Sequence, residues 1–207
     1  MARPVHADAA ATRRRILATA LAMFAEHGLD GVSIRTIASA AGVSLATVHH
    51  YFGSKDDLYE ACIDSMYEEL IAMRPRLAAE LRAGAERAES PATMAERIVR
   101  AAFRFARAHQ IEMRLLMRGV MTAGELDDTK RERGQIPFLA EIPAVVAAIT
   151  GREAESLRLP LQSLSFLIGR YAISTERELA LFTNETGPEA IAAAEDHLVS
   201  IGRALFL

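Results

Sequence analysis

Residues Ser33–Lys55, SIRTIASAAGVSLATVHHYFGSK, decide the fold of this chain. They predict two short helices joined by a tight turn and followed at once by a third helix. Ser33 and Ser44 each stand directly before an apolar helical pattern, where a serine hydroxyl accepts a hydrogen bond from an amide of the first turn. Gly42 lies between the two helices and takes a positive φ without the penalty that a Cβ brings. The pattern indicates a helix-turn-helix, which sets its second helix into the major groove of DNA.

The second of these helices carries side chains that suit the edges of DNA bases. Val48 faces the core in the helical pattern, so the side chains around it are left for the other faces. Threonine and histidine hydrogen-bond to base edges, and small apolar side chains fit the thymine methyl group. The alternative is a helical hairpin that packs and binds nothing. The candidate base-contacting residues are Leu45, Ala46, Thr47, His49 and His50.

The start of the third helix has its own signal. Ser54, with Asp57 three residues later, has the pattern of a capping box. We expect the exposed amides there, together with Lys55, to receive a phosphate, because amides at a helix N-terminus attract anions.

The segment Val32–Leu58, VSIRTIASAAGVSLATVHHYFGSKDDL, resembles the DNA-binding signature of the tetracycline-repressor (TetR) family of bacterial transcription regulators. The preceding segment Thr12–Gly31, TRRRILATALAMFAEHGLDG, resembles that family's first helix and the loop after it. The resemblance covers about the first sixty residues. It implies an all-helical homodimer that binds a palindromic operator in double-stranded DNA and releases it when a small molecule enters the C-terminal domain.

The resemblance also implies roles for single residues. Thr47, His49 and His50 match the positions that read base edges, and Arg35 matches one at or near the groove. Histidine at both 49 and 50 departs from the commoner family pattern, in which tyrosine or another aromatic residue often stands. The residues that match phosphate-contacting positions are Ser33, Ser44, Tyr51 and Lys55.

The net charge of −3 argues at first sight against a DNA-binding protein. The positive charge is concentrated, however, because Arg13, Arg14 and Arg15 form a cluster that we place at the start of the first helix. There the charges oppose the helix dipole, which makes sense if a phosphate backbone lies nearby. The alternative is a solvated basic turn. We include Arg13 among the expected DNA contacts.

Composition predicts an all-α protein of 207 residues, because alanine and leucine dominate and strand-favouring runs are missing. We expect residues 1–54 to form the helix-turn-helix domain and residues 55–207 a helical domain for ligand binding and dimerisation. Cys62 is the single cysteine, which excludes an intramolecular disulfide and suits a reducing cytosol. No apolar stretch reaches membrane-spanning length, and residues 1–12 lack the apolar centre of a signal peptide. A cytoplasmic protein is therefore expected.

Enzymatic signals are missing from the sequence. His49 and His50 are adjacent, so they point to different sides of a helix, unlike metal ligands spaced at i and i+4. The chain has no HExxH, CxxC, GxSxG or glycine-rich phosphate loop. We expect no catalytic residue, no metal site and no cofactor.

Capping and helix-breaking residues in the rest of the sequence predict a series of helices. Asp8 is a candidate cap for the first helix, whose core face holds Ile16, Leu17, Ala20 and Phe24. The polar segment 123–135 is expected as a mobile loop, and the pattern Thr150–Glu153 as a capping box. The later helices are expected over residues 55 to the seventies or eighties with a bend at Pro75, 91–108, 111–121, 150–182, and from 186 onward.

The helix expected from Thr150 has apolar residues on two opposite faces. Leu159, Phe166 and Ile173 lie on one of them. Two such faces imply either complete burial within one subunit or a second partner. With the last helix, the other stripe would form a four-helix interface in a homodimer, as the resemblance also implies. The expected interface residues are Leu157, Leu161, Leu164, Ile168, Leu198, Ile201, Gly202 and Leu205.

A ligand pocket is a further candidate. Met113, Met117 and Met121 recur every four residues, which fits either a permissive apolar pocket or an ordinary core. Arg170 must be paired or reach water, so it meets either an internal acidic side chain or an acidic ligand group. The candidate pocket residues are Phe103, Met113, Met117, Phe166, Arg170 and Tyr171.

The sequence therefore predicts a ligand-responsive DNA-binding transcription regulator. We expect a repressor that leaves a palindromic operator when it binds a small apolar or amphipathic effector. Two alternatives stay open. One is a DNA-binding protein of the same fold that senses nothing, and the other is a helical small-molecule-binding protein.

Overall fold

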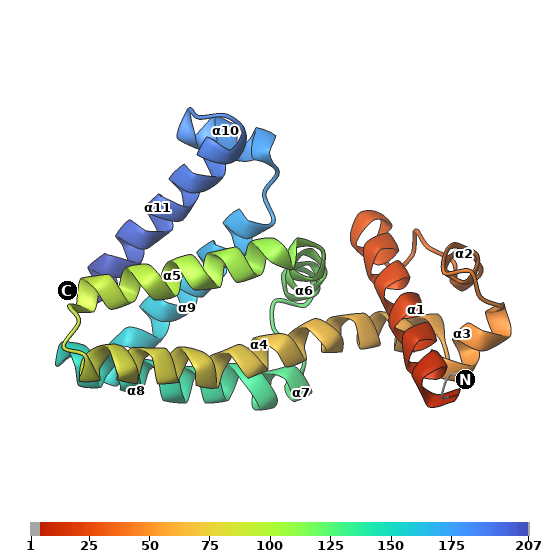
Figure 1. Cartoon of the computed structure of the whole chain (residues 1–207), viewed down its shortest axis with the longest axis horizontal. Coiled ribbons are helices and arrows are strands. Elements are labelled where there is room, and N and C mark those ends of the chain that lie inside the picture. Colours follow the sequence, from red (N-terminus) through yellow and green to blue (C-terminus); the bar gives the residue numbers. More distant parts are fainter. Residues whose placement is uncertain (1–4, 207) are drawn as a thin grey trace.

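The computed structural model describes residues 5–206, and every regular element in that range is a helix (Figure 1). The all-helical fold with an N-terminal helix-turn-helix is confirmed. The helices are α1 (Val5–His27), α2 (Ile34–Ala40), α3 (Leu45–Phe52), α4 (Lys55–Glu86), α5 (Pro91–Ala108), α6 (Gln110–Ala123), α7 (Asp128–Lys130), a π-helical turn (Arg131–Gln135), α8 (Ile136–Thr150), α9 (Ala154–Ala172), α10 (Glu176–Thr183) and α11 (Gly187–Phe206).

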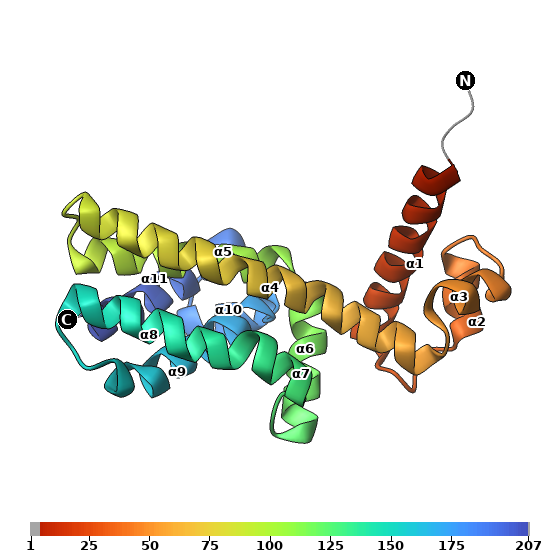
Figure 2. The ribbon, with the colours of Figure 1, turned by 90° about the horizontal axis from the view of Figure 1, so that it is seen from below.

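Helix α4 connects two parts of the molecule. At one end lie α1, α2 and α3, which we call the reading unit (Figure 1). From there α4 runs along the other part, where α5 and α8 lie beside it and α9 and α11 complete the bundle (Figure 2). The molecule is therefore elongated, with the reading unit at one end.

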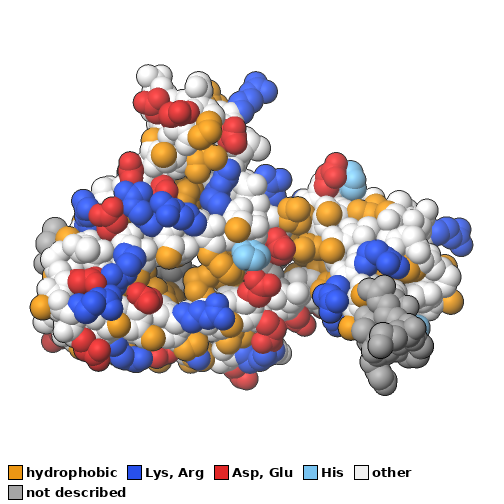
Figure 3. Space-filling model, in the orientation of Figure 1, with side chains coloured by type: hydrophobic (Ala, Val, Ile, Leu, Met, Phe, Trp, Pro, Cys, Tyr) orange, Lys and Arg blue, Asp and Glu red, His pale blue; other side chains and the backbone are white. Residues whose placement is uncertain are grey.

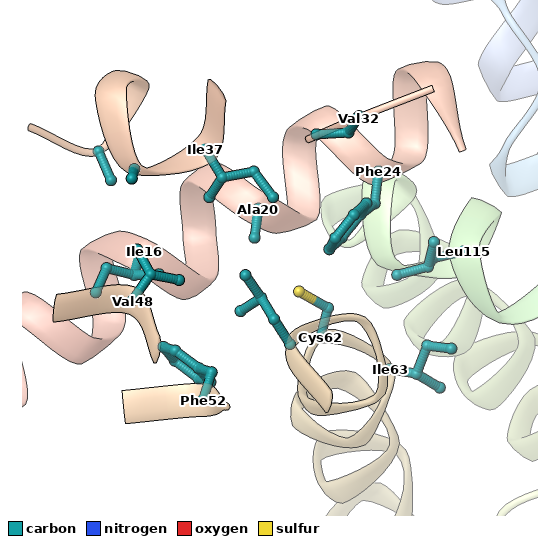
Figure 4. Packing of buried hydrophobic residues seen from close by; sticks show 13 residues of the cluster. Ile16, Ala20, Phe24, Val32, Ile37, Val48, Phe52, Cys62, Ile63 and Leu115 are labelled. Carbon is teal, nitrogen blue, oxygen red and sulfur yellow. The ribbon is translucent and has the colours of Figure 1, made fainter. Parts of the chain in front are cut away.

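The reading unit has its own apolar core, shown in Figure 4. Ile16, Ala20 and Phe24 of α1 are fully buried in it, as the helical spacing predicts. Cys62 of α4 also lies there, and burial raises the pKa of its thiol to about 12, so it acts as a small apolar side chain. Leu115 reaches the same core from α6, so two helices of the C-terminal part help to hold the reading unit.

The C-terminal part is built around α5. α11 packs along one side of α5, and a Cβ at Gly202 would stand only 2.6 Å from Cγ2 of Val99. A residue without a side chain is therefore needed at that crossing. Among residues 5–206, no single helix has the length and apolar composition to cross a membrane; the bent pair Asp128–Thr150 and Ala154–Ala172, which turns by 115°, meets both criteria together.

Several predicted boundaries were wrong. Asp8 lies inside α1, which begins at Val5, so it does not cap that helix. Thr150 ends α8 instead of opening a helix, because the next residue, Gly151, takes φ +73° and caps the helix C-terminus. Helix α9 begins after Glu153 without a side-chain cap and ends at Ala172.

A new helix then starts after Thr175, whose hydroxyl accepts a hydrogen bond from the amide of Glu178 at 3.2 Å. The break between α9 and α10 is the reason that the predicted helix does not continue to Phe182. The segment expected as a loop, 123–135, contains α7 and the π-helical turn.

The predicted dimer face also needs correction. Leu157, Leu161, Leu164 and Leu198 are buried inside one subunit, and Gly202 is buried against α5. Ile168, Ile201 and Leu205 are half-buried and pack against the same core. Leu157 and Leu161 pack with α4, α5 and α8, whereas Leu164 and Leu198 pack between α5, α9 and α11. Because this stripe is used within the subunit, its buried members cannot meet a second subunit. The opposite side of α9 is exposed, with Leu159 at 75% and Phe166 at 43%.

Candidate nucleic-acid interface and central cavity

The turn between α2 and α3 follows the predicted geometry. The hydroxyl of Ser33 accepts a hydrogen bond from the amide of Thr36 at 3.1 Å, and that of Ser44 does the same for Thr47 at 3.0 Å. Gly42 has φ +65°, which allows the amide of the next residue to bond back to Ala38. These contacts fix the angle between α2 and α3, and so determine which face of α3 is presented to solvent.

That face holds the expected base-contacting residues. Val48 and Phe52 point into the core, while Ala46, His49 and His50 are exposed. His49 Nδ1 lies 2.7 Å from the carbonyl oxygen of Gly53, so this nitrogen carries the proton and donates it. Only Nε2 of His49 is then free. Leu45, Thr47 and Tyr51 lie on the flanks of the same face and are half-buried.

The expected phosphate contacts have mixed surroundings. Arg35 is exposed, and the guanidinium of Arg13 lies 4.9 Å above the ring of Phe52. Lys55 donates from Nζ to the carbonyl of Leu29 at 3.1 Å, so one of its three protons is already used. Arg15 ties α1 to the turn by donating to the carbonyl of Ala41 at 2.9 Å. Since α1 begins at Val5, the arginine cluster stands well inside the helix and the dipole argument does not apply.

The predicted capping box at α4 is present and changes the expected phosphate site. The carboxylate of Asp57 accepts hydrogen bonds from the amide of Ser54 at 2.8 Å and from its hydroxyl at 2.7 Å. These bonds lower the pKa of Asp57. The amide of Ser54 is therefore already bonded to a carboxylate, and the negative charge of Asp57 disfavours a phosphate at the same place.

A cavity of about 530 Å³ lies between α4, α5, α6, α8 and α9. Its wall is mostly apolar, and on the face shown in Figure 3 the surface is hollowed between α4 and α5 with hydrophobic side chains in view. Pockets of about 300–1,000 Å³ with such a lining hold small molecules. Of the expected pocket residues, Met113, Met117 and Phe166 line it.

The other three expected pocket residues lie elsewhere. Phe103 is 1% exposed and packs in the core between α5, α9 and α11. Arg170 pairs with Glu178 at 2.5 Å and lowers the pKa of that carboxyl, so the internal acidic partner is the correct alternative. Tyr171 packs edge-on against His197, with 6.2 Å between ring centroids. None of the three contributes to the cavity wall.

Sequence reasoning missed the contributions of α4 and α8 to the wall. Leu70, Leu77 and Phe138 line the cavity, as does Arg74. The apolar run IPFLAEIPAVVAAI, which forms most of α8, was available as a signal. The pattern of α4 was less clear, because charged residues interrupt its apolar positions.

The segment Gly124–Gln135, which we call the strap, covers part of the cavity and is anchored on α4. Lys130 is 6% exposed, and its Nζ lies 2.8 Å from Asp127, 3.2 Å from Glu60 and 3.3 Å from Asp64. Burial alone would lower the pKa of Lys130, but the hydrogen bonds to Asp127 and Glu60 outweigh it and raise the pKa. Tyr67 adds a hydrogen bond to the carbonyl of Lys130 at 2.5 Å.

Comparisons with known proteins agree with this architecture. The family model for "Bacterial regulatory proteins, tetR family" matches residues 16–62. The HTH-type transcriptional regulatory protein RaaS of Mycobacterium tuberculosis is 52% identical over 56 residues, which make up 27% of this chain and 26% of that protein. The chain thus matches about a quarter of the length of that relative. The HTH-type transcriptional dual regulator CecR of Shigella flexneri is 26% identical over 186 residues, covering 84% of this chain and 83% of CecR.

The fold is shared over the whole length. A solved TetR-family transcriptional regulator from Mesorhizobium loti has a TM-score of 0.66 and 19% sequence identity, covering 95% of this chain and 96% of the other. These relatives and neighbours are DNA-binding transcription regulators and not enzymes. The helix-turn-helix of this chain thus matches the TetR family of bacterial transcription regulators, and the whole chain shares the fold of a solved TetR-family regulator.

Proposed function

We propose that this regulator binds a palindromic operator as a homodimer and leaves it when a small, mostly apolar molecule enters the cavity. The observation that carries the proposal is that α4 and α6 each contribute both to the cavity wall and to the core of the reading unit. An unliganded dimer on its operator would block transcription, so the protein acts as a repressor. It does so in the cytoplasm, where the DNA is accessible.

The DNA contacts are assigned as follows. Thr47 and His50 read base edges, with His49 contributing through Nε2 and Arg35 at the groove margin. Leu45 and Ala46 contact apolar base atoms. The capping serines are exposed and lie toward the backbone of the DNA in this arrangement. The phosphate-contacting residues are Arg13, Ser33, Ser44, Tyr51 and Lys55.

The dimer is assigned to the outer side of α9. Leu159 and Phe166 are exposed and lie about two helical turns apart, so they share one face, and Phe166 also borders the cavity. Large exposed apolar side chains at helical spacing support a partner helix, and a second copy of α9 supplies a self-complementary one. In such a dimer the two α3 helices would span half-sites about 34–36 Å apart.

Release requires that the ligand binds a DNA-incompetent arrangement more tightly than the competent one. The strap, α6 and α4 form the connection from the cavity to the reading unit. A ligand that displaces the strap would act through Lys130 and Tyr67 on the half of α4 nearest the DNA. Coupling of about 1–3 kcal/mol is typical for such switches.

Operator selection tests the proposal. The purified protein would be used to select binding sites from random duplex DNA, and footprinting would then measure the length and symmetry of the site. A palindrome with half-sites one helical turn apart is the expected result. A single unpaired half-site would contradict the homodimer. Tight operator binding that no small molecule changes would leave the effector-free alternative in place.

A further inference from the structure

The wall of the cavity contains a single basic side chain among the described residues, that of Arg74 on α4. Two other ionisable side chains line the cavity, and both are already bound. Glu125 is paired with Arg131 at 2.8 Å, and the hydroxyl of Tyr67 donates to the carbonyl of Lys130. Arg74 therefore determines the charge that the cavity presents to a ligand.

The guanidinium of Arg74 is incompletely satisfied. Its Nε is buried and has no hydrogen-bond partner. Arg74 forms an ion pair with Glu141 on α8, whose Oε2 lies 3.5 Å from Nε without forming a hydrogen bond. The other oxygen of Glu141 accepts a hydrogen bond from Arg82 at 3.2 Å. Two guanidinium groups thus share one carboxylate, which leaves one positive charge in excess beside the cavity.

A buried N–H donor without a hydrogen-bond acceptor is costly even within an ion pair, and a group that supplies the missing acceptor binds favourably there. Arginine presents paired N–H donors that match the two oxygens of a carboxylate. A monoanion balances the excess charge, whereas the nearby Glu141 repels a dianion such as a phosphate monoester. The apolar remainder of the cavity, including Met113 and Met117, offers space for an extended apolar body.

We propose that the cavity binds an amphiphile with one carboxylate, whose acid group pairs with Arg74 and whose apolar body lies along α6. This inference rests on the proposed function only in taking the cavity as the effector site. It names the ligand class, which neither the cavity volume nor its apolar lining determines.

Titration calorimetry on the full-length protein, without DNA, tests the inference. The probes are dodecanoate, dodecan-1-ol and dodecyl phosphate, each used below micelle formation. The wild type should bind dodecanoate at least tenfold more tightly than the other two. Arg74→Gln should weaken dodecanoate at least tenfold and leave dodecanol within twofold. Arg76→Gln is the matched control and should leave dodecanoate binding unchanged, because Arg76 is exposed on the same helix and does not line the cavity.

A second variant tests the sign of the local charge. Glu141→Gln removes the competing carboxylate and should strengthen dodecanoate binding several-fold. If Arg74→Gln does not fold, as judged by circular dichroism, Arg74→Lys keeps the charge but loses the paired donors. That variant should then weaken dodecanoate several-fold without affecting dodecanol.

Several results would overturn the inference. Equal binding of dodecanoate and dodecanol by the wild type would show that Arg74 anchors nothing, and so would dodecanoate binding that is unchanged in Arg74→Gln. Tighter binding of dodecyl phosphate would assign the site to a dianion. A separate measurement of operator affinity tests the proposed function. If dodecanoate binds through Arg74 but leaves operator affinity unchanged, ligand-induced release from DNA is refuted, while Arg74 remains the residue that binds the carboxylate.

Discussion

Leu115 and Met117 stand two positions apart on α6 and face two different interiors of the protein. Leu115 is 1% exposed and completes the core of the reading unit, whereas Met117 lines the central cavity. Side chains at this spacing point to nearly opposite sides of a helix. A ligand that pushes on Met117 therefore moves the same rigid element that packs beneath the DNA-reading helices.

His50→Ala should change the sequence preference of the protein. His50 is exposed on α3 and has no hydrogen bond to the described residues that would hold its ring, so both ring nitrogens are free to meet bases. Loss of one good base contact costs about 1–3 kcal/mol at the affected base pair. Fluorescence anisotropy with the operator and its single-base variants measures the effect. Arg35→Ala is the comparison, and should weaken binding to all variants more evenly.

Unchanged affinity and preference in His50→Ala would remove His50 from the base contacts. His49→Ala should shift the preference less, because one nitrogen of His49 is already bound to the carbonyl of Gly53.

Leu159→Glu should convert the proposed dimer into a monomer. Leu159 is 75% exposed, so the substitution leaves the subunit core intact and places a charge in the proposed contact of α9 with its copy. Sedimentation velocity should show a halved mass, and operator affinity should fall steeply. Leu181→Glu on α10, at a residue 80% exposed, is the matched control and should remain dimeric. A Leu159→Glu protein that stays dimeric with normal operator affinity would place the interface elsewhere.

The helix-turn-helix could be predicted from the sequence because its signals are local. Capping serines, a glycine at positive φ and a short apolar period act within a few residues, and the structure reproduces each of them. The dimer face could not be predicted in the same way. Helical periodicity reveals two apolar faces on α9, but which face meets α5 and α11 depends on how the bundle folds back on itself.

The cavity had the same difficulty. Phe103 and Met113 both belong to the same buried cluster, yet only Met113 also borders the cavity. The size of the cavity depends on how completely the side chains of five helices fill the space between them. The sequence of one helix therefore does not determine it. The pairing of Arg170 with Glu178 depends on the helix break near Ser174, where Thr175 begins a new helix.

The strap should become less firmly held in acid. Hydrogen bonds from Lys130 outweigh the desolvation of Asp127 and lower its pKa from 3.8, so its contribution to stability is present above that value and is lost as the pH falls through the lowered pKa. Removing the lysine by Lys130→Met leaves Glu60, Asp64 and Asp127 facing one another without a cation. The variant should therefore melt at a lower temperature than the wild type at neutral pH.

The difference in melting temperature between wild type and Lys130→Met should narrow as the pH falls from about 4 through the lowered pKa of Asp127, because this carboxylate is then protonated in the wild type as well as in the variant. Calorimetric scans from neutral pH to pH 3 measure this difference. The exposed pair Arg158–Glu155 provides the control, since Arg158→Met removes a surface ion pair and should have little effect at any pH. A difference that is the same at all pH values would show that Lys130 acts by packing alone.

Met117→Trp should fill the cavity without disturbing the DNA-reading face. The larger side chain has space to occupy. The variant should therefore keep the melting temperature of the wild type, and its operator affinity should stay within twofold. Binding of the fluorescent dye anilinonaphthalene sulfonate should weaken at least tenfold, because the dye and the indole compete for the same volume. Met121→Trp is the matched control one turn along α6, where the side chain is 62% exposed and lies outside the cavity wall.

If Met117 were instead part of a tightly packed core, the added volume would cost about 1–3 kcal/mol of stability. A large fall in melting temperature with unchanged dye binding would therefore show that Met117 is a core residue and that the dye site lies elsewhere.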